Sequence, residues 1–122
     1  MSVFDPHDLS ALLTALEAAT EGSRELDERI ALYVGWAVQP DGRTQAGIPA
    51  YSTILDAALT LVPDGMWWLL GKGQTRPDEP LYGAQIMLRS GHGYAVDVVA
   101  ETEAHTPALA MCCAALRSKI YN

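Results

Sequence analysis

The chain has 122 residues, of which 49% are hydrophobic, and its formal net charge at pH 7 is -7. This length and apolar content predict one domain, residues 1–122, with a real core, and they exclude a disordered chain. The excess of acidic residues disfavours direct binding to nucleic acid or to an anionic membrane.

The sequence favours a cytoplasmic protein. It contains no apolar run of membrane-spanning length, and its first residues lack the basic start and long apolar centre of a signal peptide. Cys112 and Cys113 are adjacent, and neighbouring cysteines seldom form an unstrained disulfide. A reducing compartment is therefore expected.

Two helices are predicted before residue 36. Asp5-Pro6-His7-Asp8 has the carboxylate, Pro and second acid of a helix start, and this helix should run to about Thr20. Glu21-Gly22 breaks it, and Ser23 can cap a second helix over residues 24–34. The first helix has an apolar face of Leu9, Leu12, Leu13, Leu16 and Ala19. The acidic residues of this hairpin are Glu21, Glu25, Asp27 and Glu28, which predict a solvated face or, alternatively, a patch that docks on a basic partner.

The central stretch, residues 51–71, reads as a helix, a turn and a strand, after a long loop over residues 36–50. Ser52 and Thr53 are candidate caps for the helix, with Asp56 placed as in a capping box. Pro63-Asp64-Gly65 ends the helix and turns the chain. Residues 66–70 form the strand, in which Trp67 and Trp68 point to opposite faces, so at least one should be core.

Two more strands and a helix complete the pattern. The strands are expected over residues 81–89 and 94–100, joined by Ser90-Gly91-His92-Gly93, while acidic residues 101–105 read as a turn. Thr106-Pro107 opens a last helix to about Lys119. Its inward residues should be Leu109, Ala110, Cys113, Leu116 and Ile120. The short connections predict an α+β fold: a three-stranded antiparallel meander layered with about four helices, an α-β-α sandwich, in the order three helices, three strands, one helix.

Three phrases, at residues 23–32, 51–63 and 103–116, resemble the small phage and prophage proteins of the phage ABA sandwich domain family. Members share an Arg-Glu-Leu-Asp start, a Tyr-Ser/Thr helix, Val-Pro-x-Gly-Trp and a Thr-Pro-Ala-Leu-Ala helix. The chain departs from this pattern in having Met66 before Trp67. The resemblance implies a phage or prophage origin, the host bacterial cytoplasm, and a small antiparallel sheet layered with helices. It carries no catalytic residues to transfer.

No metal, cofactor or catalytic site is predicted. The histidines His7, His92 and His105 have no second ligand at metal spacing. Ser90-Gly91-His92 is more often a polar hairpin than a nucleophile and base. Cys112 and Cys113 lie in an apolar helix and should be core thiols of little reactivity. We therefore expect a protein that is not an enzyme.

A binding site is the sharper hypothesis. Gly71-Lys72-Gly73 and Gly91-His92-Gly93 could bring backbone amides and a cation to a phosphate. Neither precedes a helix, and the motifs by themselves favour two flexible turns. Aromatic planes beside Arg or Lys hold nucleobases and their phosphates; the alternative is sheet core with a solvated Arg. The candidate ligand-binding residues are Trp67, Trp68, Lys72, Arg76, Tyr82, Arg89, His92 and Tyr94.

With the phage or prophage origin that the resemblance implies, we expect a phage accessory protein that counters host defence. In the first hypothesis, homo-oligomers bind and sequester a small nucleotide-derived signalling molecule. In the alternative, the acidic hairpin binds a host defence protein, for example a CRISPR or other nuclease complex, and inhibits it.

Overall fold

The computed structural model describes residues 8–36, 47–73, 81–89 and 96–119. Within these ranges the order is three helices, three strands and a helix, which confirms the predicted α+β class and element order. The elements are α1 (Leu9–Ala18), α2 (Arg24–Tyr33), α3 (Leu55–Leu59), β1 (Met66–Gly73), β2 (Leu81–Arg89), β3 (Val96–Ala104) and α4 (Pro107–Ser118).

The strands form one antiparallel sheet in the order β1-β2-β3, as the short connections predicted. Trp68 of β1 lies opposite Ile86 of β2, and Ile86 lies opposite Ala100 of β3. The register of β3 then shifts, because Met87 pairs with Val98 rather than with the residue next to Ala100. This bulge bends one end of β3 without changing which face of β2 is buried.

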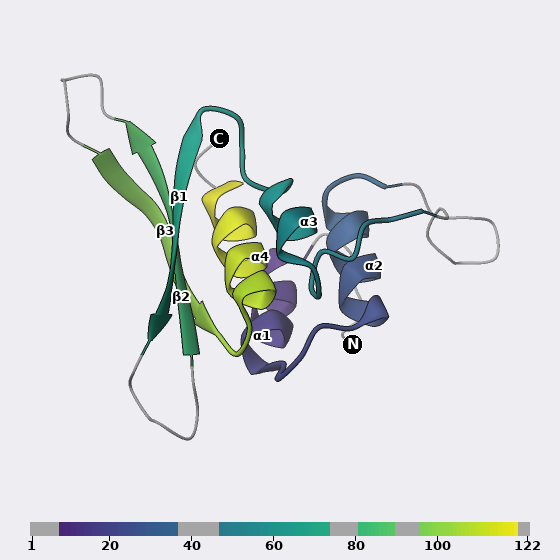
Figure 1. Cartoon of the computed structure of the whole chain (residues 1–122). Helices are drawn as coiled ribbons and strands as arrows, with labels where there is room; N and C mark the ends of the chain where they lie inside the picture. Colours follow the sequence, from purple (N-terminus) through teal and green to yellow (C-terminus); the bar gives the residue numbers. More distant parts are fainter. Residues whose placement is uncertain (1–7, 37–46, 74–80, 90–95, 120–122) are drawn as a thin grey trace.

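The described helices lie together on one side of the sheet, as Figure 1 shows. Helix α4 contacts β2 and β3 on one side and α1 and α3 on the other, and α2 packs against α1. The layers are therefore the sheet, then α4, then the remaining helices, rather than a sheet with helices on both sides. The opposite face of the sheet carries no described helix.

Helix α4 is the centre of the core. Every residue from 108 to 116 is buried. The prediction that only one side of this helix faces the core is therefore wrong, because the helix is buried on all sides. The stretch has no charged residue and four alanines, a composition typical of a helix surrounded by protein. Thr106 caps it by accepting from the Leu109 amide at 3.1 Å, as predicted.

The helix starts are only partly as predicted. Ser23 caps α2, since its hydroxyl accepts from the Leu26 amide at 3.2 Å. Helix α1 begins later than expected, because Asp8 rather than Asp5 is its cap and accepts from the Ala11 amide at 3.1 Å. Gly65 has a φ of +82°, which agrees with its predicted role in the turn before β1.

The predicted cap of α3 is wrong. The cap position is Ile54, without a side-chain hydrogen bond, and Ser52 is fully buried instead. The Ser52 hydroxyl donates to Asp27 Oδ1 at 2.6 Å and accepts from the Ser23 amide at 3.0 Å. The Ser52 amide also donates to Asp27 Oδ1, at 2.8 Å. A partner on α2 has therefore displaced the local cap.

This serine–aspartate contact joins two of the phrases that carry the family resemblance. The third phrase reaches the same place, because the Cys112 thiol of α4 donates to the Tyr51 carbonyl at 3.0 Å. Gly22 permits the close approach, since a Cβ there would overlap the Ser52 carbonyl. The three phrases thus specify helix packing in this fold.

The acidic stretch after residue 100 is strand rather than the expected turn. Glu101 pairs with Gln85, and Glu103 pairs with Gly83. Thr102 and Ala104 point inward and are buried, while the two glutamates are exposed. The alternation of small and acidic residues is the period-two pattern of a strand with one face in water.

Candidate functional site

The side of the sheet away from α4, called the outer face here, is apolar at one end and acidic at the other. Cross-strand pairing places Trp67 beside Met87, and Met87 beside Val98. Trp67 is 55% exposed, Leu69 56% and Val98 49%. Described residues of the outer face include Trp67, Leu69, Gly71, Leu81, Gly83, Gln85, Met87, Val98, Glu101 and Glu103.

Neither of the two tryptophans is core, contrary to the prediction that at least one would be. Trp67 lies on the outer face, and Trp68 lies on the helix side but is still 45% exposed. Trp68 stays partly open although Met66 and Leu70, its neighbours on the same face of the edge strand β1, pack against the core. Exposure of both rings is a tertiary effect that strand alternation alone does not reveal.

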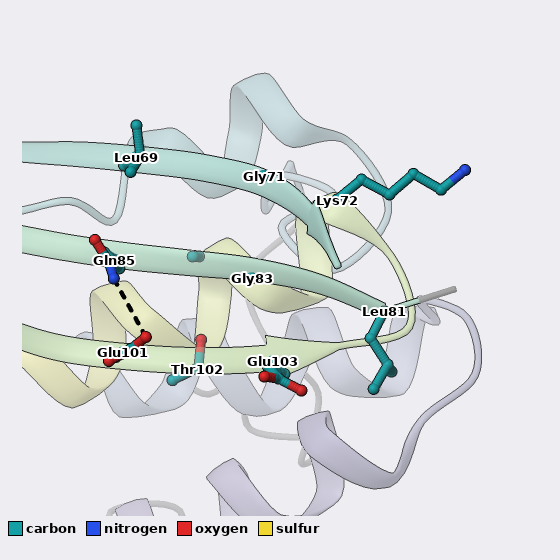
Figure 2. Close-up of a pocket in the computed structure, with 10 residues that line it drawn as sticks. Leu69, Gly71, Lys72, Leu81, Gly83, Gln85, Glu101, Thr102 and Glu103 are labelled. Atoms are coloured by element: carbon teal, nitrogen blue, oxygen red, sulfur yellow. Dashed lines mark hydrogen bonds between the residues drawn. The ribbon is translucent and has the colours of Figure 1, made fainter. Parts of the chain in front are cut away.

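A shallow hollow of about 230 Å³ lies on the outer face at the other end of β1. Its floor includes Gly71 and Gly83, which are cross-strand partners without side chains. Figure 2 shows these glycines side by side, with Leu69 and Gln85 toward one end and Leu81 at the other. The absence of two side chains in register therefore creates the hollow.

Acidic side chains dominate the hollow. Glu101 and Glu103 of β3 line it, and Gln85 Nε2 donates to Glu101 Oε1 at 3.2 Å. Lys72 also lines the hollow, but Figure 2 shows its side chain running outward past the end of the strand. Two carboxylates disfavour a phosphate and favour a Lys, Arg or amine group.

The structure does not bring the five candidate residues that it describes into one site. Lys72 and Tyr82 are cross-strand partners, and Tyr82 packs partly against the core on the helix side. The tryptophans lie four or five residues along β1 from Lys72, a separation of roughly 13–17 Å. Arg89 ends β2 near the tryptophans, at the end of the sheet opposite Lys72. Arg76, His92 and Tyr94 lie outside the described residues.

The acidic hairpin also differs from its prediction. Glu21 and Glu25 are exposed, but Asp27 is only 3% exposed and holds the Ser52 contact. Arg24 Nη1 lies 3.9 Å from Asp27 Oδ2 and donates to the Ile48 carbonyl at 3.1 Å. Asp27 is therefore part of the helix packing rather than of a solvated acidic patch.

The thiols are unsuited to chemistry at neutral pH. Burial raises the pKa of Cys112 well above its usual value, and Cys113 and Asp27 raise it further. Burial also raises the pKa of Cys113 to about 12, with a smaller contribution from Glu17. Both groups are therefore neutral side chains within the core. The described residues contain no cluster of His, Cys, Asp or Glu suited to a metal.

Comparisons with protein-family models, curated protein sequences and solved structures found no match. None of the described helices is both long and apolar enough to cross a membrane.

The outer face contains residues that the sequence did not single out. Leu69, Val98, Glu101 and Glu103 read as ordinary strand or turn residues until the register is known. The sequence feature that could have pointed to this surface is the pair Gly71 and Gly83, since isolated glycines in strands often mark close approach of another group. Only pairing shows that the two glycines are neighbours.

Proposed function

We propose that this chain is a non-enzymatic binding protein whose working surface is the outer face of the sheet. The observation that carries the proposal is the large exposed fraction of Trp67, Leu69 and Val98, three apolar side chains gathered on one side of a small sheet. Apolar patches on a protein surface commonly mark interaction sites. Trp is also among the residues that contribute most to protein interfaces.

The partner we propose is a protein that carries Lys or Arg next to exposed apolar residues. Its apolar residues would cover Trp67 and Leu69, while its cations would reach Glu101 and Glu103 at the acidic end of the same face. Desolvation of the tryptophan contributes affinity, and the carboxylates contribute orientation and rate of association. This surface replaces the acidic hairpin as the contact surface, because Asp27 is buried.

The biological setting is part of the proposal. The three phrases that resemble the phage ABA sandwich domain family support a phage or prophage accessory protein in the host cytoplasm. A net charge of -7 suits a protein that occupies a basic, nucleic-acid-binding surface. We therefore infer an inhibitor of a host defence protein, such as a nuclease complex.

Sequestration of a nucleotide-derived signal is the second candidate. The observation in its favour is the exposed ring of Trp67, at the end of the sheet where β2 finishes with Arg89. A nucleobase could stack on that ring. The carboxylates of Glu101 and Glu103 lie toward the other end of the face and give such a ligand no support there.

The two candidate functions predict different bound species, a polypeptide for the inhibitor and a nucleotide-sized molecule for the sequestering protein. The tagged chain is purified from phage-infected, defence-active cells and examined by native mass spectrometry. We expect a co-purifying polypeptide, whose purified form binds the wild-type chain with an affinity that falls as salt concentration rises. The bound species should be lost with Trp67→Ser and weakened by Glu103→Lys, but kept with Glu25→Lys on α2.

Each other outcome has a definite meaning. A nucleotide-sized mass that disappears with Trp67→Ser would replace the first candidate with the second. A chain that carries nothing, or a polypeptide retained equally by all three variants, would refute the outer face as the working surface. Rescue of phage plating on defence-active cells by the wild type, lost with Trp67→Ser, tests the counter-defence role separately.

A further inference from the structure

Strand β1 is exposed on both of its faces. Trp67, Trp68 and Leu69 follow one another along the chain, yet each is at least 45% exposed. Among the described residues β1 pairs only with β2, so no described strand pairs with the backbone amides and carbonyls of its other edge. A partner lying on the outer face alone would cover Trp67 and Leu69 but leave Trp68 and this edge exposed.

The two edges of the sheet are protected differently. Strand β3 carries Asp97, Glu101 and Glu103 and contains the bulge near Val98, and charges and bulges both discourage pairing with another strand. Strand β1 has no charge from Met66 to Gly71, no proline, and a continuous register with β2. The edge of β1 is thus open to another strand, and the edge of β3 is blunted.

We infer that two copies of this chain pair through their β1 edges, antiparallel and about a two-fold axis, to form one six-stranded sheet. A second copy fits because antiparallel pairing of identical strands is self-complementary. An axis near Leu69 brings the uncharged halves together and puts the two Lys72 residues about 20 Å apart. The acids of β3 lie about 10 Å from the β1 edge, across two strand spacings, which limits repulsion between two chains of charge -7.

Pairing of this kind accounts for the exposure of Trp68. Each Trp68 lies on the helix side of β1 and is 45% exposed there. In the dimer the two rings lie between the α4 helices of the two copies and cover each other's edges. The outer faces of the copies also become one continuous surface. The inference concerns the strand edge and does not depend on what binds the outer face.

Single-cysteine cross-linking tests the pairing. Leu69→Cys and Leu70→Cys place a thiol near the axis, where facing Cα atoms are close enough for a disulfide. Lys72→Cys and Val98→Cys are matched controls at the strand end and on β3. The native Cys112 and Cys113 are buried and do not compete. Under mild oxidation we expect a covalent dimer from at least one of the two central variants and none from the controls.

Sedimentation of the reduced proteins gives an independent measurement. The wild type should sediment as a dimer, Leu69→Lys as a folded monomer, and Val98→Lys as a dimer, with circular dichroism confirming the fold of each. A wild type that is monomeric at all concentrations overturns the inference. So does loss of the dimer in both lysine variants, since that pattern indicates association through the outer face, or equal cross-linking of central and control cysteines.

Discussion

The two faces of the sheet reverse the usual distribution of large and small apolar residues. On the covered face, Ala84, Ala100 and Ala104 are almost fully buried and, with Ile86, contact the α4 layer. On the outer face, the larger side chains of Trp67 and Leu69 are more than half exposed. Small residues allow close approach of an apolar helix, so the covered face is built for packing. The outer face retains apolar area that the described fold does not bury, and this is the reason we propose it as a binding surface.

The largest expected effect separates the faces by stability. Ile86→Ala should lower the free energy of unfolding by about 2–5 kcal/mol, because Ile86 is fully buried and its loss leaves a cavity. Leu69→Ala on the outer face should change it by less than about 0.5 kcal/mol. Urea unfolding of the two variants measures this contrast, and equal losses would show that the outer face is also packed.

A second test uses pH to probe the thiols behind the covered face. The usual thiol pKa is 9.0, and burial raises that of Cys113 to about 12, so the folded state holds the proton more tightly. The contribution of the protonated Cys113 thiol to the free energy of unfolding is therefore complete below pH 9, and it is lost as the pH rises toward 12. We expect a fall on the order of a few kcal/mol in the free energy of unfolding.

The Cys112→Ala/Cys113→Ala double variant is the control, because it removes both thiols and leaves every other group in place. Its stability should fall less steeply with pH than that of the wild type. Parallel pH profiles would mean that the thiols are not protonated core groups.

A third test concerns the outer helix layer behind α4. Ser52→Ala should cost about 1–3 kcal/mol, since it removes a hydrogen bond to the buried Asp27 carboxylate. Thr53→Ala, at an exposed neighbour, should cost much less. A helix cap at Thr53 would give the opposite ranking, and chemical unfolding of the two variants distinguishes these outcomes.

The smallest effect sharpens the description of the outer face. Gly83→Ala should raise stability by up to about 1 kcal/mol, because the φ of Gly83 lies outside the left-handed range and its Cβ would lie 3.9 Å from the Thr102 carbonyl oxygen. The same methyl partly fills the hollow. Thermal unfolding gives the stability, and binding of the partner to Gly83→Ala shows whether the hollow takes part. A destabilised variant would mean that the strand does not accept a side chain there.

Much of the fold was predictable because its signals are local. Ser23 and Thr106 lie beside the first turns of their helices, and Pro63-Asp64-Gly65 needs only its own chemistry to form a turn. The candidate site was less predictable. Trp67 and Lys72 are close in sequence, but an extended strand separates them, while Gly71 and Gly83 become neighbours only through pairing.

The sequence by itself determined the element order, the antiparallel meander and the inert character of the thiols, since each depends on local propensity, loop length or apolar surroundings. Tertiary structure alone decided that Ser52 bonds to Asp27 instead of capping α3, because a buried carboxylate needs partners more than an exposed helix end does. It also decided that both tryptophans stay exposed. Trp67 is exposed because no described element covers the outer face, and the exposure of Trp68 depends on how the helix layer packs against the edge strand β1, which involves residues distant in sequence.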